Sequence, residues 1–313
     1  MSLDLYLPAL RPFLEDPEVT EIYVNPDGLL FTDRQSGGRT PTPVSLSAGA
    51  LRAFLNAVAS ACGVLLNDER PELSAQLPLE EPFWGARLQA YISPLVEAPA
   101  MIVRKHSRAH FSLADLVRHG TLIQAEAKRL RRALERRENL LIAGGTSSGK
   151  TTFLDALLSE LPASERVVLI EDTRELKAGT ADWLSLVTSP THSTLNLLAA
   201  ALRSHPDRIV LGELRDGAAY AFLEALSTGH PGGATTIHAN TAASALSRLA
   251  RLAALALANE TGISYDAVLA LVRETVDLVV VMASTPKGRR VLDLAEVGHS
   301  ASFALTSLGR ETP

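Results

Sequence analysis

Apolar positions along the first hundred residues follow two different periods. Helical spacing predicts helices at residues 5–14 and 47–62, and Ser47 is available as an N-cap for the second. Alternating spacing predicts strands at residues 19–25, 29–33, 73–79, 87–92 and 101–104. Pro26-Asp27-Gly28 supplies a hairpin turn, whereas the glycines and prolines of residues 35–43 predict a loop. Hairpins with segregated helices are typical of a small α+β domain.

From residue 121 onward, predicted helices and strands alternate. Helices are expected at residues 124–137, 152–161, 193–203 and 216–227. Short apolar runs predict strands at residues 139–143, 166–170, 208–211, 234–237 and 276–282. This alternation indicates an α/β domain with a mostly parallel sheet covered by helices on both faces. Such sheets bind ligands beyond the carboxyl ends of their strands.

We therefore expect an N-terminal α+β domain at residues 1–105, a linker at 106–120 and an α/β domain at 121–313. The linker is polar and basic, with a short helix expected at residues 113–118. It contains three histidines, His106, His110 and His119. Their spacings come without an acidic partner, which favours a solvated connector over a metal site.

Composition narrows the function classes. The chain has 313 residues, 46% of them hydrophobic and 21% charged, as expected of two globular domains. A formal net charge of −5 argues against direct DNA binding driven by net charge. The single cysteine, Cys62, excludes an internal disulfide framework, and its alanine neighbours predict a buried thiol. Without a secretory signal or a long apolar run, the chain is expected to be soluble and cytoplasmic, while still able to dock on a membrane complex.

Residues 144–151 carry the most informative motif. They read Gly-Gly-Thr-Ser-Ser-Gly-Lys-Thr, a full match to G-x-x-x-x-G-K-[ST], between a predicted strand and a predicted helix. In this context a glycine-rich turn that binds nothing is disfavoured. Lys150 would reach the β- and γ-phosphates of ATP, and the Thr151 hydroxyl would ligate Mg²⁺. The predicted phosphate-binding residues are Gly144, Gly145, Thr146, Ser147, Ser148, Gly149, Lys150, Thr151 and Thr152.

Carboxylates follow two of the predicted strands. Glu171, Asp172 and Glu175 come after the strand at 166–170, which favours a cation or water-activating role over a solvated acidic loop. Glu213 follows the strand at 208–211, in a Gly-Glu pair where an aspartate is usual. It would hold Mg²⁺ or orient the attacking water. The catalytic candidates are thus Glu213, Glu171, Glu175 and Lys150, and the metal candidates are Thr151, Glu171 and Glu213.

Three further side chains complete the predicted site. Arg215 stands where it could pair with Glu213 or with a phosphate, and both interpretations stay open. His230 and His238 flank a glycine-rich turn and a strand. A lone buried histidine is commonly structural, but two in this setting better fit a sensor of the γ-phosphate.

The order of these motifs resembles a known family. The loop at 144–151, the acidic segment at 170–173, the element at 212–215 and the histidine segment at 229–240 resemble the four motifs of the secretion-superfamily ATPases: Walker A, Asp box, atypical Walker B and His box. Residues 14–22 and the following hairpin resemble the branch that serves type IV secretion and conjugation, including TrbB-like ATPases. The resemblance spans about residues 10–285.

The resemblance implies a RecA-like C-terminal core and a PAS-like N-terminal domain, assembled as a homo-hexamer with ATP and Mg²⁺ bound between the two domains. Arg87 and Arg104 stand at the places of arginines that contribute to such sites. The sequence contains no tetracysteine zinc motif, and its short N-terminal region is expected to lack the extra domain of the larger members. Both absences favour the type IV branch over a type II secretion or pilus-extension motor.

The resemblance thus predicts a motor ATPase at the inner face of the bacterial inner membrane, powering substrate transfer or pilus biogenesis. Its partners would be inner-membrane machinery components and a coupling protein. A Tad-type or retraction pilus ATPase shares the same motifs and stays an alternative. Lys150, Thr151 and Glu213 argue against a non-hydrolysing nucleotide-dependent scaffold. The lack of an N-K-x-D string disfavours a GTPase, and nothing indicates the acceptor pocket of a nucleoside kinase.

Overall fold

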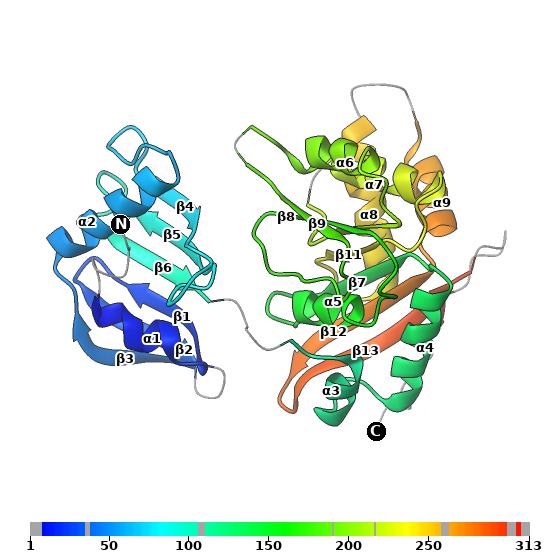
Figure 1. Ribbon diagram of the computed structural model, residues 1–313, viewed down its shortest axis with the longest axis horizontal. Coiled ribbons are helices and arrows are strands. Elements are labelled where there is room, and N and C mark those ends of the chain that lie inside the picture. The colour runs from blue at the N-terminus through cyan, green and yellow to red at the C-terminus, as the bar shows by residue number, and fades with distance from the viewer. Residues whose placement is uncertain are drawn as a thin grey trace. The chain divides into compact units, whose positions relative to one another are not determined.

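The computed structural model describes residues 8–34, 38–105, 110–189, 191–215, 217–257, 263–298 and 305–307. The chain divides into two compact units, Met1–Ala109 and His110–Pro313 (Figure 1). We call them the N-terminal and C-terminal units and describe each by itself. In the part of the chain described, no helix is both long and apolar enough to cross a membrane.

An antiparallel sheet forms the frame of the N-terminal unit. Its six strands run in the order β3-β2-β1-β6-β5-β4. Their bounds are β1 (Val19–Val24), β2 (Leu29–Arg34), β3 (Gly38–Ser45), β4 (Glu72–Gln76), β5 (Arg87–Tyr91) and β6 (Ala100–Arg104). A short helical segment, η2 (Pro8–Leu10) and α1 (Arg11–Glu15), precedes the sheet.

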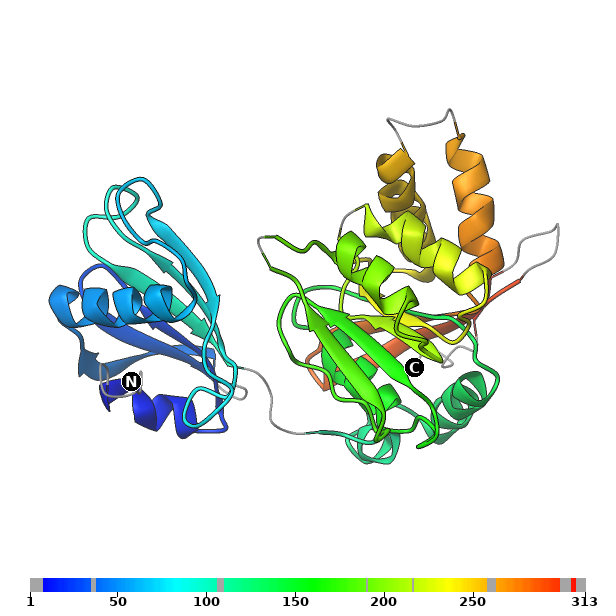
Figure 2. The same ribbon diagram turned by 45° about the horizontal axis from the view of Figure 1, so that its top comes forward.

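The helix α2 (Ala48–Ala61) covers one face of this sheet (Figure 2). The Ser47 hydroxyl accepts a hydrogen bond from the Ala50 amide at 3.2 Å, which confirms the predicted N-cap. Phe54 and Leu55 of α2 are buried against Leu88 and Val103, which alternate with exposed or half-buried neighbours along their strands. One face of the sheet therefore carries the core, while the other bears polar side chains.

Two predictions for this unit are wrong. Residues 38–43, expected in a loop, belong to β3, which pairs with β2 at the edge of the sheet. An edge strand tolerates Pro41 and Pro43 because one side of its backbone needs no partner strand. Cys62 is exposed, not buried, because it ends α2 as the C-cap residue instead of facing the core.

The C-terminal unit contains an eight-stranded sheet in the order β14-β13-β12-β7-β11-β10-β8-β9. The strands from β12 to β9 in this order are parallel to their neighbours, whereas β13 and β14 are antiparallel. Their bounds are β7 (Leu140–Gly144), β8 (Val167–Glu171), β9 (Trp183–Val187), β10 (Arg208–Leu211), β11 (Ala234–Ile237), β12 (Leu278–Thr285), β13 (Gly288–Val297) and β14 (Leu305–Ser307).

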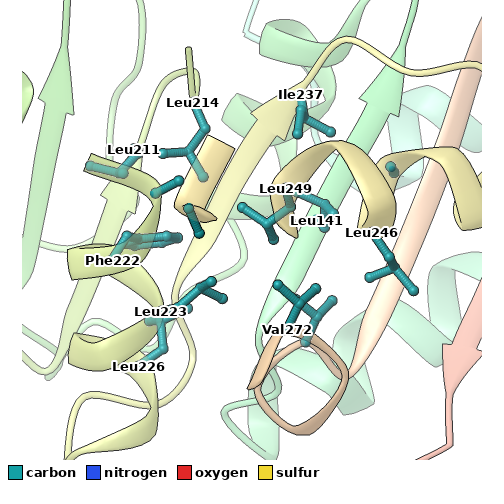
Figure 3. Packing of buried hydrophobic residues seen from close by; sticks show 14 of the residues in the cluster. Leu141, Leu211, Leu214, Phe222, Leu223, Leu226, Ile237, Leu246, Leu249 and Val272 are labelled. Carbon is teal, nitrogen blue, oxygen red and sulfur yellow. The ribbon is translucent and has the colours of Figure 1, made fainter. Parts of the chain in front are cut away.

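Helices cover both faces of this sheet, as the sequence pattern predicts (Figures 1 and 2). The bounds are α3 (Leu113–Arg118), α4 (Gln124–Glu135), α5 (Lys150–Leu158), α6 (Thr194–Leu202), α7 (Ala218–Ser227), α8 (Ala242–Leu257) and α9 (Tyr265–Thr275). One apolar cluster joins the sheet to α6–α9, and the other joins it to α3–α5. Figure 3 shows side chains of α7, α8 and α9 converging on Leu141 of β7.

The structure places residues 110–120, expected in the linker, within the C-terminal unit. Ser112 and Asp115 form a capping box that begins α3. Leu113 and Leu116 are buried in the cluster that includes α4 and α5. This segment therefore packs as part of the core, and the solvated linker that we expected is too long. His106 lies outside the described residues.

The topology gathers the motifs at one edge of the sheet. The strands β7, β11, β10 and β8 are consecutive neighbours and run parallel. The phosphate-loop motif follows β7, His238 follows β11, Glu213 follows β10, and Glu171 ends β8. Because the carboxyl ends of parallel strands share an edge, segments up to about a hundred residues apart meet there.

Candidate nucleotide-binding site

The loop between β7 and α5 has the backbone shape of a phosphate cradle. Ser147 and Gly149 adopt positive φ angles of 60° and 91°, which turn the chain sharply into α5. Gly144 is packed so closely that a Cβ there would lie 2.4 Å from Ser148 Oγ and 2.6 Å from the Met282 carbonyl oxygen. The motif glycines are therefore required by conformation at Gly149 and by space at Gly144.

Lys150 begins α5, and its side chain contacts the backbone of this loop. Its ammonium donates hydrogen bonds to the carbonyl oxygens of Gly144 at 3.0 Å and Gly145 at 2.8 Å. Only 8% of the residue is exposed. A buried ammonium is stable only with such partners, and here they also fix its position at the mouth of the loop.

The remaining loop residues fit an anion. Ser148 is 2% exposed, and its hydroxyl has no hydrogen-bond partner among the described residues. The first amides of α5 add the positive end of the helix, where Thr151 and Thr152 lie half-buried. Thr146 and Ser147 are exposed at the tip of the loop. An unpartnered buried hydroxyl beside a helix N-terminus and an ammonium matches the donors that a polyphosphate needs.

Glu213 connects to Lys150 through His238. The Glu213 carboxylate lies 3.2 Å from His238 Nε2, and His238 Nδ1 lies 3.5 Å from the Lys150 ammonium. On its other side Glu213 accepts from the Arg215 guanidinium at 2.5 Å, and Arg215 also lies 3.5 Å from Asp172. Of the two interpretations of Arg215, the structure shows the pairing with Glu213, and a contact with phosphate stays a prediction.

These contacts set the charge states at the site. Burial raises the pKa of Glu213, but Arg215, His238 and Lys150 outweigh it, so the pKa is lower than usual. Burial lowers the pKa of His238, and Lys150 lowers it further against the opposing effect of Glu213. At neutral pH the site therefore holds an ionised carboxylate and a neutral imidazole that can report charge changes nearby.

Glu171 lies on the neighbouring strand and is fixed by the backbone. One carboxylate oxygen accepts from the amides of Glu175 at 2.9 Å and Leu176 at 3.0 Å, and the residue is only 5% exposed. Gly212 leaves room for it, since a Cβ there would lie 3.3 Å from Glu171 Cγ. The Glu175 side chain is half-exposed and acts on Arg215 through its charge. Glu171 is thus better positioned than Glu175 for a role at the site.

The described residues contain no group of three or more His, Cys, Asp or Glu side chains arranged to hold a metal ion. The three metal candidates nevertheless come from segments at the same edge of the sheet: Thr151 follows β7, Glu213 follows β10 and Glu171 ends β8. Mg²⁺ is commonly bound by one or two protein oxygens together with waters and substrate phosphates. This sparse donor set fits that mode of binding and not an all-protein cage.

The structure separates the two predicted histidines. His238 follows β11 and joins the site, whereas His230 precedes β11. The turn between them lies beside Asn139, since the Asn139 side chain accepts from the amides of Gly232 and Gly233. Asn139 directly precedes β7, so His230 lies at the edge of the sheet opposite the phosphate loop. His230 therefore does not join the loop and His238 within one chain, and its role in nucleotide binding stays a prediction.

Arg87 and Arg104 lie in the N-terminal unit and face each other. They are directly opposite partners on β5 and β6, and Glu21 of β1 stands opposite Arg104. The Arg104 guanidinium lies 3.8 Å from the Glu21 carboxylate and is half-exposed. Two like charges directly opposite each other destabilise a sheet. An anion between or beside Arg87 and Arg104 would offset this repulsion.

Some side chains that support the loop were not predicted from the sequence. Asp155 of α5 lies 2.8 Å from His110 Nδ1 and also accepts from the Lys177 amide at 2.9 Å. It ties α5 to the start of the C-terminal unit and to the segment after Glu171. An aspartate in the otherwise apolar stretch 153–158 was the available signal. Arg248 of α8, which lowers the pKa of His238, and Arg289 of β13 carried no signal of their own.

Comparisons with known proteins agree with this geometry. The model of the type II/IV secretion system protein family matches residues 85–289. The chain belongs to this family. It is 39% identical to the probable conjugal transfer protein TrbB of Sinorhizobium fredii, over 92% of this chain and 86% of the relative. It is 34% identical to the type IV secretion system protein VirB11 of Bartonella henselae, over 79% of each chain.

Solved structures show the same fold. The VirB11 ATPase of the Brucella suis type IV secretion system, solved with sulphate, is 31% identical and covers 94% of each chain with a TM-score of 0.51. The pilus retraction motor PilT is 17% identical, covers 99% of this chain and 83% of its own, and has a TM-score of 0.68. The second likeness shows the fold alone. Within its family the chain is therefore a type IV secretion or conjugal transfer ATPase.

Proposed function

We propose that this chain hydrolyses ATP to ADP and phosphate in the presence of Mg²⁺. The observation that carries the proposal is the connected row of Lys150, His238 and Glu213 at the mouth of the phosphate loop. A structural glycine-rich turn would not require a buried ammonium, a neutral imidazole and an ionised carboxylate in contact. A lysine at the phosphates and a carboxylate that orients water are recurring parts of phosphoryl-transfer sites, and His238 connects the two here.

Each residue has a role in this proposal. Lys150 and the loop amides bind the β- and γ-phosphates, and the Ser148 hydroxyl donates to a phosphate oxygen. Glu213 accepts a hydrogen bond from the attacking water and orients it, while Glu171 is the alternative for this role. Thr151, Glu171 and Glu213 would hold Mg²⁺, the last two through water. The bound ion would neutralise charge that develops between the phosphates. His238 would sense the γ-phosphate through its contacts with Lys150 and Glu213.

The assembly follows from the same family. We infer a RecA-like fold for the C-terminal unit, a PAS-like fold for the N-terminal unit, and a homo-hexamer that binds nucleotide between the two domains. Arg87 and Arg104 would then meet phosphate charge from the N-terminal side. The domains would correspond to residues 1–105 and 121–313, and residues 110–120 would move with the second. The paired arginines and the loop would clamp one nucleotide, so that binding closes the domains.

In the cell, this ATPase would power substrate transfer or pilus biogenesis at the cytoplasmic face of the inner membrane. Its partners would be inner-membrane machinery components and a coupling protein, while direct contact with DNA is disfavoured by the net charge of −5. The TrbB and VirB11 relatives favour transfer or secretion over a retraction or Tad-type pilus role. Plasmid transfer should therefore fall in a deletion strain while twitching and surface adhesion stay at the parental level.

The biochemical test uses the purified full chain. Phosphate release should require both ATP and Mg²⁺ and should stop when EDTA is added. Mass measured by light scattering should correspond to six copies in the presence of ATP. A ring that binds ATP and releases no phosphate would replace this proposal with the nucleotide-dependent scaffold. If the chain hydrolyses ATP while it is monomeric, the hexamer is not needed for the activity and that part of the proposal is wrong.

A further inference from the structure

Arg289 lies against the phosphate loop from a part of the chain that no motif covers. The hairpin of β12 and β13 places Arg289 opposite Ser284, two residues beyond Met282, which pairs with Gly144 at the start of the loop. A Cβ built on Gly149 would lie 2.9 Å from Arg289 Cδ and 3.7 Å from Arg289 Nε. The stem of Arg289 therefore crosses the last glycine of the loop, in space that any other residue at 149 would occupy.

The guanidinium of Arg289 has no hydrogen-bond or ion-pair partner among the residues that the structure describes. The residue is exposed. Its neighbour Arg290, by contrast, donates to the Gly120 carbonyl oxygen at 2.9 Å. The two adjacent arginines of β13 therefore differ: Arg290 anchors the hairpin to Gly120, whereas the charge of Arg289 lies beside the phosphate loop.

The acidic side chains of the site lie on the opposite side of the loop from Arg289. Arg215 is already paired with Glu213 and Asp172, and Glu171 adds a further carboxylate on the same side of the loop. A polyphosphate entering the loop meets this negative charge from β8 and β10. Arg289 lies on the other side of β7, since the sheet runs β13-β12-β7-β11-β10-β8. It supplies positive charge on the side of β7 away from Glu171 and Glu213, next to the N-terminus of α5.

We propose that Arg289 is a further phosphate-binding residue that contacts the part of the nucleotide shared by ATP and ADP. This inference rests on the proposed ATPase function. Glu213 and His238 mark the side of the loop where the γ-phosphate and the attacking water would lie, and Arg289 is on the opposite side. Its guanidinium therefore holds the phosphates that remain after hydrolysis, so it strengthens nucleotide binding in both states and contributes little to the chemical step.

The test compares Arg289→Gln with Lys287→Gln. Lys287 is an exposed cation on the same hairpin, and its variant removes the same charge from a side chain that is not among the nearest neighbours of Gly149. Titration calorimetry with ADP, and with the ATP analogue AMPPNP, should show about tenfold weaker binding of both nucleotides to Arg289→Gln, as expected for loss of one charge-assisted hydrogen bond near the surface. Lys287→Gln should bind both nucleotides within about twofold of the parent.

Kinetics and melting provide independent readouts. In Arg289→Gln the KM for ATP should rise about tenfold, while kcat changes by less than about threefold. The melting temperature without nucleotide should match the parent, and the increase caused by ADP should shrink. Unchanged ADP affinity in Arg289→Gln would overturn the inference, as would equal losses in both variants. Failure of the parent to hydrolyse ATP would instead overturn the proposed function, so the two failures are distinguishable.

Discussion

Replacing Glu213 with glutamine should separate nucleotide binding from turnover. The amide keeps the size of the side chain and can still accept from Arg215, but it loses the negative charge. The Glu213 carboxylate oxygens lie 2.5 Å from the Arg215 guanidinium and 3.2 Å from His238 Nε2. Only 19% of the Glu213 side chain is exposed, so water screens these interactions weakly. The variant therefore tests charge at one position while leaving the shape of the site unchanged.

The expected magnitude follows from the contacts. A charge-assisted hydrogen bond contributes about 1.5–3 kcal/mol, and about 1.4 kcal/mol corresponds to a tenfold change in rate. Loss of an oriented water and of the charge near Mg²⁺ should then lower kcat by about 10²-fold. Affinity for ATP should stay similar or increase slightly, because the variant removes a negative charge from the vicinity of the phosphates.

The assay pairs phosphate release with the titration of His238 followed by NMR. Glu213 raises the pKa of His238 against burial and Lys150, so in Glu213→Gln this pKa should fall further below its usual value. ATP binding that fails together with hydrolysis would refute the reasoning, and Glu171 would become the catalytic candidate. An unchanged His238 pKa would show that the two side chains are not coupled.

Three further predictions concern stability and the N-terminal unit. Arg208→Ala removes a guanidinium that is 1% exposed and leaves the buried Glu165 carboxylate with Arg137 as its remaining partner, so chemical denaturation should show a loss of up to about 3–5 kcal/mol in the free energy of unfolding. The hydrogen bond from the Ser112 hydroxyl is the largest of the contacts that lower the pKa of Asp115 to about 2. Ser112→Ala should therefore raise the pKa of Asp115, which NMR titration would measure. The stability that this contact contributes is fully present above the ordinary aspartate pKa and is lost as the pH falls through about 2. Arg104→Ala should keep the circular dichroism spectrum of the parent but lose most ATP-driven closure in small-angle scattering and much of its phosphate release, and a variant that closes and turns over normally would make Arg104 a residue of the sheet only.

The phosphate loop could be predicted from sequence because its determinants are local. The glycine spacing, the preceding apolar strand and the following helix lie within about twenty residues of one another, and the conformations of Ser147 and Gly149 follow from that segment. Glu213 and His238 were identified one at a time from their places after strands. Their contact with each other required the adjacency of β10 and β11, which the alternation of elements does not specify.

The errors and omissions have physical causes. His230 was predicted at the site because it and His238 flank a glycine-rich turn and a strand, but that strand carries the two residues to opposite edges of the sheet. Arg289 reaches Gly149 only through the pairing of β12 with β7, so no local pattern announces it. The edge strand β9 was missed because Trp183–Val187 is half-buried along most of its length and shows little alternation of apolar and polar positions.

Phosphate release by Lys150→Ala shows whether the loop at residues 144–151 is the catalytic site. The Lys150 ammonium is held by two loop carbonyl oxygens and is in contact with His238, so its loss removes the point charge at the mouth of the loop. Melting temperatures and oligomer mass, measured beside the rate, show whether the variant stays folded and assembled. We expect Mg²⁺-dependent ATP hydrolysis by the parent and at least a ~10²-fold slower rate in the folded variant. Turnover near that of the parent in folded Lys150→Ala would contradict this expectation.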